Sequence, residues 1–224
     1  MRNEGNASKL IFVGNHICLD FINTQIIHKG RIVDLLRDFS HLVEWLAETE
    51  LLDFTKSKET LRKLTGNPER ERVLAQAREF RAVLRAIIER IIEGKPIQKS
   101  AIDAINKLLS NRIGYPQLIQ ARNGFKTQFY AESSEAIHLI VPIAESASDL
   151  LCHGDFSLIK KCDNPDCILY FYDISKNHAR RWCSMNICGN RMNEPPETEI
   201  RGSIPSRLSG TKTYLFKRPP EFKW

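Results

Sequence analysis

Four cysteines in the C-terminal third of the chain have the spacing of a metal site. Four residues separate Cys162 from Cys167, and four separate Cys183 from Cys188. Fifteen residues lie between the two pairs. Two such pairs can turn the backbone around one cation and supply a closed tetrahedral set of thiolates, which is typical of structural zinc. Two disulfides or four unrelated thiols are the alternatives, but the chain begins without a secretory signal. The spacing therefore predicts one structural zinc ion per chain.

Positive charge is concentrated around these cysteines. The chain has a formal net charge of +6, and residues 160–224 hold 12 basic and 7 acidic residues, against 21 and 20 in residues 1–159. A basic excess on a small zinc module indicates a polyanionic partner, of which nucleic acid is the first candidate. The alternative is a solvated cationic surface.

The segment between the two cysteine pairs joins basic side chains to an aromatic one. Lys176, Arg180 and Arg181 precede Trp182, so that these cations could contact phosphates or a guanine edge. Trp182 and the neighbouring tyrosines could instead form the small core of the module while the cations only solubilise it. Gly189, directly after Cys188, is predicted to take a positive φ and let the chain turn away from the metal.

The rest of the chain predicts an α+β fold with a mainly helical N-terminal domain. With 224 residues and 42% hydrophobic residues, the chain can bury one ordinary core and carry a small module. Apolar spacing predicts a short strand, a turn and a helix over residues 10–26, and a helix after Asp38 or Ser40. It also predicts a long helix over 68–93, a helix over 97–109, a β-hairpin over 125–143 with its turn at 132–135, and a helix over 147–158.

These elements divide into three consecutive domains. We expect a helical sensor or interaction domain over 1–157, a zinc finger over 158–192 and a Pro-containing, loosely structured tail over 193–224. No segment approaches the roughly twenty apolar residues that span a bilayer, so we expect a soluble, cytoplasmic protein with no membrane partner.

Three polar residues near the N-terminus share one face of the first predicted helix. Asp20, Asn23 and Thr24 could line a ligand pocket, or they could cap a neighbouring helix or tie this domain to the zinc module, and we favour the structural role. His16, Cys18 and Asp20 resemble a nucleophile with its base, but such closely spaced residues in a turn are usually local hydrogen-bonding groups. We therefore do not expect an enzyme.

Several motifs resemble known families. CDNPDC, SKNHARRWC and CSMNICGNR closely resemble the CGNR zinc-finger family, while FVGNHICLDFINT and LVEWLAETELLD resemble the ABATE domain that precedes that finger. The resemblance implies a stress-induced transcription regulator with a zinc-dependent, DNA-binding end. It assigns the metal to Cys162, Cys167, Cys183 and Cys188, and the surrounding motif to Arg180, Arg181, Trp182, Asn190 and Arg191.

One departure from the family bears on DNA affinity. Members of the family continue past the CGNR tetrad in a basic helix, whereas this chain continues MNEPPETEIRGSIP. We therefore predict weak binding to duplex DNA through Lys176, Arg180, Arg181, Asn190 and Arg191, unless a homodimer adds a second set of contacts. The N-terminal domain would sense a small-molecule effector or a partner. The alternative is a zinc-stabilised protein-interaction module without direct DNA contact.

Overall fold

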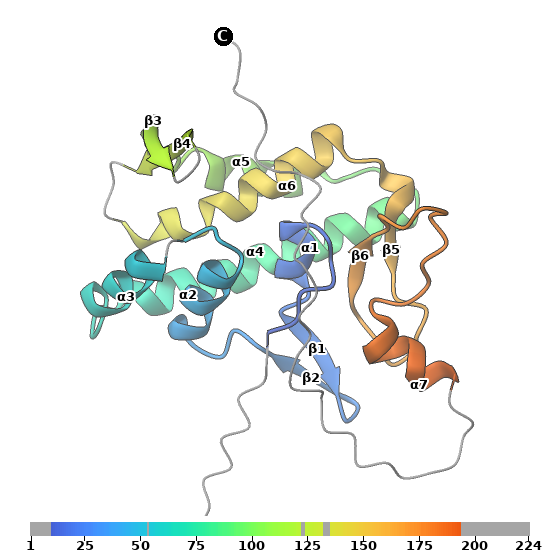
Figure 1. The fold of residues 1–224 in the computed structure, drawn as a ribbon. Helices are drawn as coiled ribbons and strands as arrows, with labels where there is room; N and C mark the ends of the chain where they lie inside the picture. The colour runs from blue at the N-terminus through green and yellow to red at the C-terminus, as the bar shows by residue number, and fades with distance from the viewer. Residues whose placement is uncertain (1–9, 53, 122–123, 132–134, 194–224) are drawn as a thin grey trace, which may run out of the picture. The chain divides into compact units, whose positions relative to one another are not determined.

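The computed structural model describes residues 10–52, 54–121, 124–131 and 135–193 (Figure 1). The chain forms two compact units. Within the described residues, we call 10–35 together with 155–193 the split unit, and 36–154 the helical unit. Both match the expected α+β class, because helices dominate and the strands form only small antiparallel pairs.

The helical unit is organised around one long helix. Its helices and its strand pair are α2 (Phe39–Glu48), α3 (Phe54–Lys63), α4 (Glu69–Ile92), α5 (Lys99–Leu109), the 3₁₀ turn η1 (Ala136–Leu139), α6 (Val141–His153), β3 (Gly114–Ala121) and β4 (Gly124–Ala131). Helix α4 packs against α2, α5 and η1, and α5 packs against α6. The prediction of a long helix over 68–93 is confirmed, because Val73, Leu74, Ala77, Phe80, Leu84, Ile87 and Ile88 form its buried face.

Helix α2 has a side-chain cap at its first turn. The Asp38 carboxylate accepts hydrogen bonds from the backbone N–H of His41 at 3.1 Å and from the Ser40 hydroxyl at 2.5 Å. Burial alone would raise the pKa of Asp38, but these hydrogen bonds hold it well below the usual carboxyl range. Arg78 of α4 fixes the same region, because its guanidinium donates to the backbone carbonyl of Leu36 at 2.6 Å.

The predicted β-hairpin over 125–143 is wrong in its second strand. Strand β4 pairs with the preceding strand β3, with Leu118 opposite Thr127, whereas Ala136–Leu139 is a 3₁₀ turn and α6 begins at Val141. Pro142 lies in the first helical turn, where its missing N–H is not needed. The predicted turn at residues 132–135 falls mostly outside the described residues.

The split unit is built from the two ends of the described chain. Its elements are α1 (Ile17–Ile22), β1 (Gln25–His28), β2 (Arg31–Asp34), the 3₁₀ turn η2 (Phe156–Leu158), β5 (Ile159–Lys161), β6 (Tyr170–Tyr172), the π-helical turn η3 (Met185–Gly189) and α7 (Asn190–Asn193). The predicted helix over 147–158 is therefore wrong at its end, since α6 stops at His153 and a separate 3₁₀ turn follows.

The N-terminal segment differs from its prediction in two ways. Residues 10–13 form no strand, and the first helix ends at Ile22, so that Ile26 lies in a strand opposite Val33. Lys29 and Gly30 connect the two strands with φ values of 50° and 72°. Two consecutive left-handed residues make the tight turn that suits a two-residue hairpin connection, and this feature overrides the apparent helical spacing.

The compact units do not follow the chain order of the three expected domains. Residues 10–35 lie in one compact unit with 155–193, whereas the expected first domain runs without a break from 1 to 157. The expected tail at 193–224 lies almost wholly outside the described residues. None of the helices that the structure describes is long and apolar enough to cross a membrane.

We predict that Asp38→Ala lowers the free energy of unfolding by about 1 kcal/mol, because α2 loses its cap. The pKa of Asp38 is lower in the folded protein than in the unfolded chain, so this stabilisation is present above about pH 4 and is lost as the pH falls below it. Thermal unfolding followed by circular dichroism at pH 7 and pH 3 measures both effects. Asp103→Ala, which removes an exposed ion pair with Lys99, should cost less than half as much.

Candidate metal centre and its basic surface

The four cysteines of the split unit meet in one buried cluster. Their sulfur atoms all lie within 4.8 Å of one another, and the Sγ of Cys183 is 3.9 Å from that of Cys167 and 3.6 Å from that of Cys188. Tetrahedral zinc with Zn–S bonds of about 2.3 Å places its sulfur ligands about 3.8 Å apart. The residues present therefore fit a structural zinc ion, and these cysteines form the only such group of potential ligands among the described residues.

Backbone hydrogen bonds shape the first pair of ligands. Asn164 accepts the N–H of Asp166 with its side chain at 2.9 Å and the N–H of Cys167 with its carbonyl at 2.9 Å, so the chain turns sharply between the two cysteines. The N–H of Cys162 donates to the carbonyl of Leu169 at 2.9 Å, which continues the pairing of β5 with β6. The strands thereby bring both cysteines to the same end of the hairpin.

Of the second pair of ligands, Cys188 lies in the π-helical turn η3, and Cys183 lies just before Ser184, the N-cap of this turn. The N–H groups of Cys188 and Gly189 both donate to the carbonyl of Ser184, at 2.9 and 3.0 Å. The predicted positive φ at Gly189 is wrong, because this residue belongs to η3. Its lack of a side chain matters for a different reason: a Cβ there would lie 2.7 Å from the Met185 sulfur and 3.2 Å from the Trp182 ring.

The surroundings of the cysteines favour bound thiolates. The N–H of Cys183 points at the sulfur of Cys162 at 3.3 Å. Val13, Leu169 and Phe171 are buried in the same cluster as the four cysteines, with Ile11, Ile26, Trp182 and Ile187 packed against it. An apolar shell of this kind excludes water from a structural metal.

The N-terminal segment completes the metal module through β6. The Asn23 side chain donates to the carbonyl of Tyr170 at 2.8 Å and accepts the N–H of Tyr170 at 2.9 Å, as a neighbouring strand would do. The N–H of Tyr172 donates to the carbonyl of Gly14 at 2.8 Å. Gly14 must stay small, because a Cβ at this position would lie 2.8 Å from the backbone nitrogen of Asp20.

Asp20, Asn23 and Thr24 are at most 1% exposed. Asp20 accepts the N–H of Gly14 at 2.7 Å, and the Thr24 hydroxyl donates to the carbonyl of Phe21 at 2.7 Å. With the Asn23 bonds to Tyr170, these contacts connect backbone segments within the split unit. The structure thus gives all three residues an architectural role, and the predicted face of one continuous helix does not form, since only Asp20 lies within α1.

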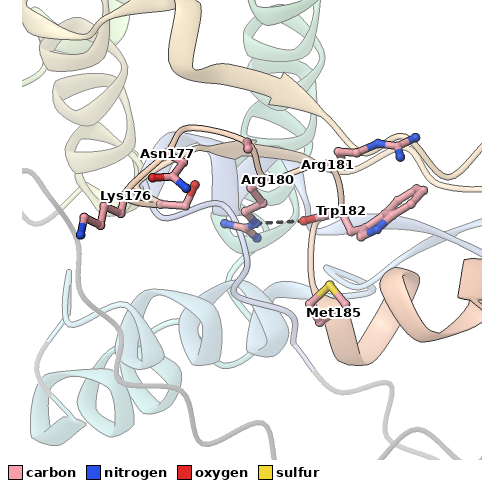
Figure 2. Close-up of a pocket in the computed structure, with 8 residues that line it drawn as sticks. Lys176, Asn177, Arg180, Arg181, Trp182 and Met185 are labelled. Carbon is pink, nitrogen blue, oxygen red and sulfur yellow. Dashed lines mark hydrogen bonds between the residues drawn. The ribbon is translucent and has the colours of Figure 1, made fainter.

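Arg180 lies inside the module, although its sequence position suggests a DNA contact. Its guanidinium donates to the carbonyl of Trp182 at 2.9 Å (Figure 2). It also donates to the carbonyls of Val13 at 3.0 Å and of Cys183, and it stacks 4.1 Å from the centre of the Phe171 ring. Burial lowers the pKa of Arg180 below the ordinary arginine value. Arg180 therefore joins the N-terminal segment to the cysteine loop, a role that the sequence motif did not reveal.

A buried carboxylate orders the loop that carries the basic residues. Asp173 is fully buried and accepts hydrogen bonds from Lys160 at 2.7 Å, from Ser175 and from the N–H of Arg180 at 3.0 Å. Burial opposes ionisation, but these donors hold the pKa of Asp173 well below the usual carboxyl range. His178 contacts the backbone carbonyl of Asp173 at 3.0 Å and is not part of the cysteine cluster.

The other four predicted DNA contacts lie at the surface of the split unit. Lys176, Arg181, Asn190 and Arg191 are all exposed. Arg181 is paired with Asp163 at 2.8 Å and lies 4.9 Å over the Trp182 ring. An open groove of about 540 Å³ follows this surface (Figure 2), and it is lined by Ser175, Lys176, Asn177, Ala179, Arg180, Arg181, Trp182 and Met185.

Two protein families match the chain. Residues 15–154 match the ABATE family, described as "Putative stress-induced transcription regulator", and residues 159–194 match the CGNR zinc finger. The first match covers more than half of the chain, and the second contains all four cysteines of the buried cluster. No curated protein matches the chain.

We predict that Cys162→Ser and Cys188→Ser each release the metal, because a hydroxyl is a far poorer zinc ligand than a thiolate. Zinc measured by mass spectrometry on the purified protein should fall from one ion per chain to near zero. Cys152→Ser is the matched control, since Cys152 is exposed and lies outside the cluster. Stoichiometric zinc in both ligand variants would contradict the assignment.

We predict that Arg180→Ala lowers the free energy of unfolding of the split unit by about 2 kcal/mol, because buried carbonyls lose a charged donor. The split unit should then release zinc to a chelator at lower urea concentration than the wild type. Arg181→Ala removes a neighbouring arginine whose only described ion pair is exposed, and it should change this midpoint by less than half as much. Equal effects of the two substitutions would refute the structural role of Arg180.

Proposed function

Because the chain belongs to the ABATE family and its residues 159–194 match the CGNR zinc finger, we propose that it is a transcription regulator that binds duplex DNA through the split unit. We further propose that it acts in the cytoplasm during a stress response. The thiolate cluster supports a reducing compartment, because its four cysteines are free rather than paired in disulfides.

The exposed basic surface beside the metal centre carries this proposal. Lys176, Arg181 and Arg191 project from a loop and a short helix whose backbones are held by the cysteine cluster and by Asp173. Cations on a rigid frame can neutralise phosphates without a large loss of side-chain entropy on binding. The zinc ion, when bound, supplies only the cross-link between the two cysteine pairs.

Base reading would fall to an exposed guanidinium and an exposed carboxamide of the split unit. A guanidinium can donate two parallel hydrogen bonds to a guanine edge, and a carboxamide can pair in the same way with adenine. Arg181 and Asn190 have these groups and are exposed. Trp182 gives the groove an aromatic surface on which Arg181 already stacks, and on binding DNA Arg181 would exchange its exposed ion pair with Asp163 for the base edge.

The helical unit is the proposed sensor of an effector or a partner. The ABATE family, which matches residues 15–154, is described as a regulator, and the helical unit is inserted in the chain between the two segments of the split unit. A ligand that favours one arrangement of the connections would change DNA affinity by its differential binding to the two states. A homodimer would double the phosphate contacts.

One observation favours the alternative of a protein-interaction module. In the helical unit, Leu118 and Phe125 lie on one face of the β3–β4 pair and are 68% and 73% exposed. Large apolar side chains at such exposure are typical of protein contact surfaces. This surface is compatible with either reading, because a regulator also needs partners, but an interaction module would need no DNA.

We predict that affinity for a mixed-sequence DNA duplex falls with salt, with a log–log slope of roughly −0.9 for each phosphate neutralised. Arg181→Ala and Arg191→Ala should each make this slope shallower by about one unit. Fluorescence anisotropy at 25 to 200 mM salt, with and without zinc, measures the slope. Absence of binding to any duplex in either state would support the protein-interaction alternative.

A further inference from the structure

The β1–β2 hairpin of the split unit is an element that the sequence pattern did not predict. Its tip is formed by His28, Lys29, Gly30 and Arg31, all of which are exposed. The positive φ of Lys29 and Gly30 makes the turn tight, so the tip presents Lys29 and Arg31 on a two-residue connection. The hairpin therefore carries its cations on ordered backbone rather than on a long loop.

The tip of this hairpin carries charge of one sign. Residues 25–33 contain Lys29, Arg31 and His28 and no acidic residue, and the one acidic residue of the hairpin, Asp34, lies at its base opposite Gln25. Within the described part of the chain, neither Lys29 nor Arg31 has an ion pair. Their charges are thus available to an external anion, unlike that of Lys160, which Asp173 neutralises.

The base of the hairpin is fixed to the metal module. Ile26 packs against the buried cluster that contains the four cysteines, and the N–H of Leu35 donates to the carbonyl of Thr24 at 2.8 Å. The hairpin and the finger surface therefore belong to one compact unit. Ile32, on the opposite face from Ile26, is 68% exposed and leaves an apolar side chain beside the basic tip.

We propose that the β1–β2 hairpin is a second DNA-binding element, in which Lys29 and Arg31 contact backbone phosphates of the duplex that the finger surface binds. The proposal rests on the proposed function. A two-stranded ribbon fits a DNA groove, and its cations add to the electrostatic part of the binding energy.

The β1–β2 hairpin supplies positive charge that the chain after Arg191 lacks. The chain after Arg191 lacks the basic extension of its family, and it continues with three glutamates and one arginine among residues 192–205. The hairpin restores two cations from the other end of the chain. It does so only because residues 10–35 fold with the finger rather than with the helices that follow them.

The test compares the double substitution Lys29→Ala and Arg31→Ala with Lys107→Ala. Lys107 is an exposed lysine on α5 of the helical unit and controls for the loss of positive charge in general. With a mixed-sequence duplex as the probe, the double variant should bind more weakly and show a salt slope shallower by about two units. Lys107→Ala should leave the slope unchanged. Zinc content and helical circular dichroism equal to those of the wild type show that the variants are folded.

The outcomes separate this inference from the proposed function. If the double variant keeps the wild-type slope while Arg181→Ala makes it shallower, the hairpin does not contact DNA but the finger surface does. If Lys107→Ala, which removes one charge, weakens binding and flattens the slope half as much as the double variant, which removes two, the effect is one of net charge and the hairpin proposal is overturned. If the wild type binds no duplex, both the hairpin proposal and the proposed function are rejected.

Discussion

The cross-link of four thiolates by one zinc ion is the constraint on which the split unit depends. The module has only two short strand pairs and short helices, and the cysteines themselves form much of its buried cluster, with Val13, Leu169 and Phe171. A core of this size cannot offset the conformational entropy of the loops that surround it. The metal removes this deficit, because its binding free energy is folding free energy. The cross-link between the two cysteine pairs also fixes the backbone that carries the basic side chains.

The second organising feature is the discontinuity of the split unit. Asn23 and Gly14 bond to β6 as a neighbouring strand would, and Arg180 donates to the carbonyl of Val13. The N-terminal segment is therefore a structural part of the finger, and the helical unit is an insertion within it. Two chain connections therefore join the helical unit to the split unit.

Two neighbouring arginines of the module have different surroundings. Arg180 and Arg181 are adjacent in sequence, yet one donates to three backbone carbonyls while the other lies at the surface over Trp182. Neither residue lies in a helix or strand, and they differ in their partners, since Arg180 bonds to the carbonyl of Val13 whereas Arg181 bonds to the exposed Asp163. A basic motif therefore overstates the number of cations that are available to phosphates, and the hairpin at residues 25–34 adds cations that the motif does not include.

The sequence by itself determined the features that depend on local spacing: the zinc ligands and the long helix α4, whose buried residues recur at threes and fours. It did not determine the β1–β2 hairpin, because Ile22 and Ile26 satisfy a helical period as well as they fit a helix followed by a strand. Nor could it pair Asn23 with Tyr170, 147 residues away. Such contacts are decided by tertiary structure, because they depend on which distant backbone groups are left to satisfy once the metal has closed the module.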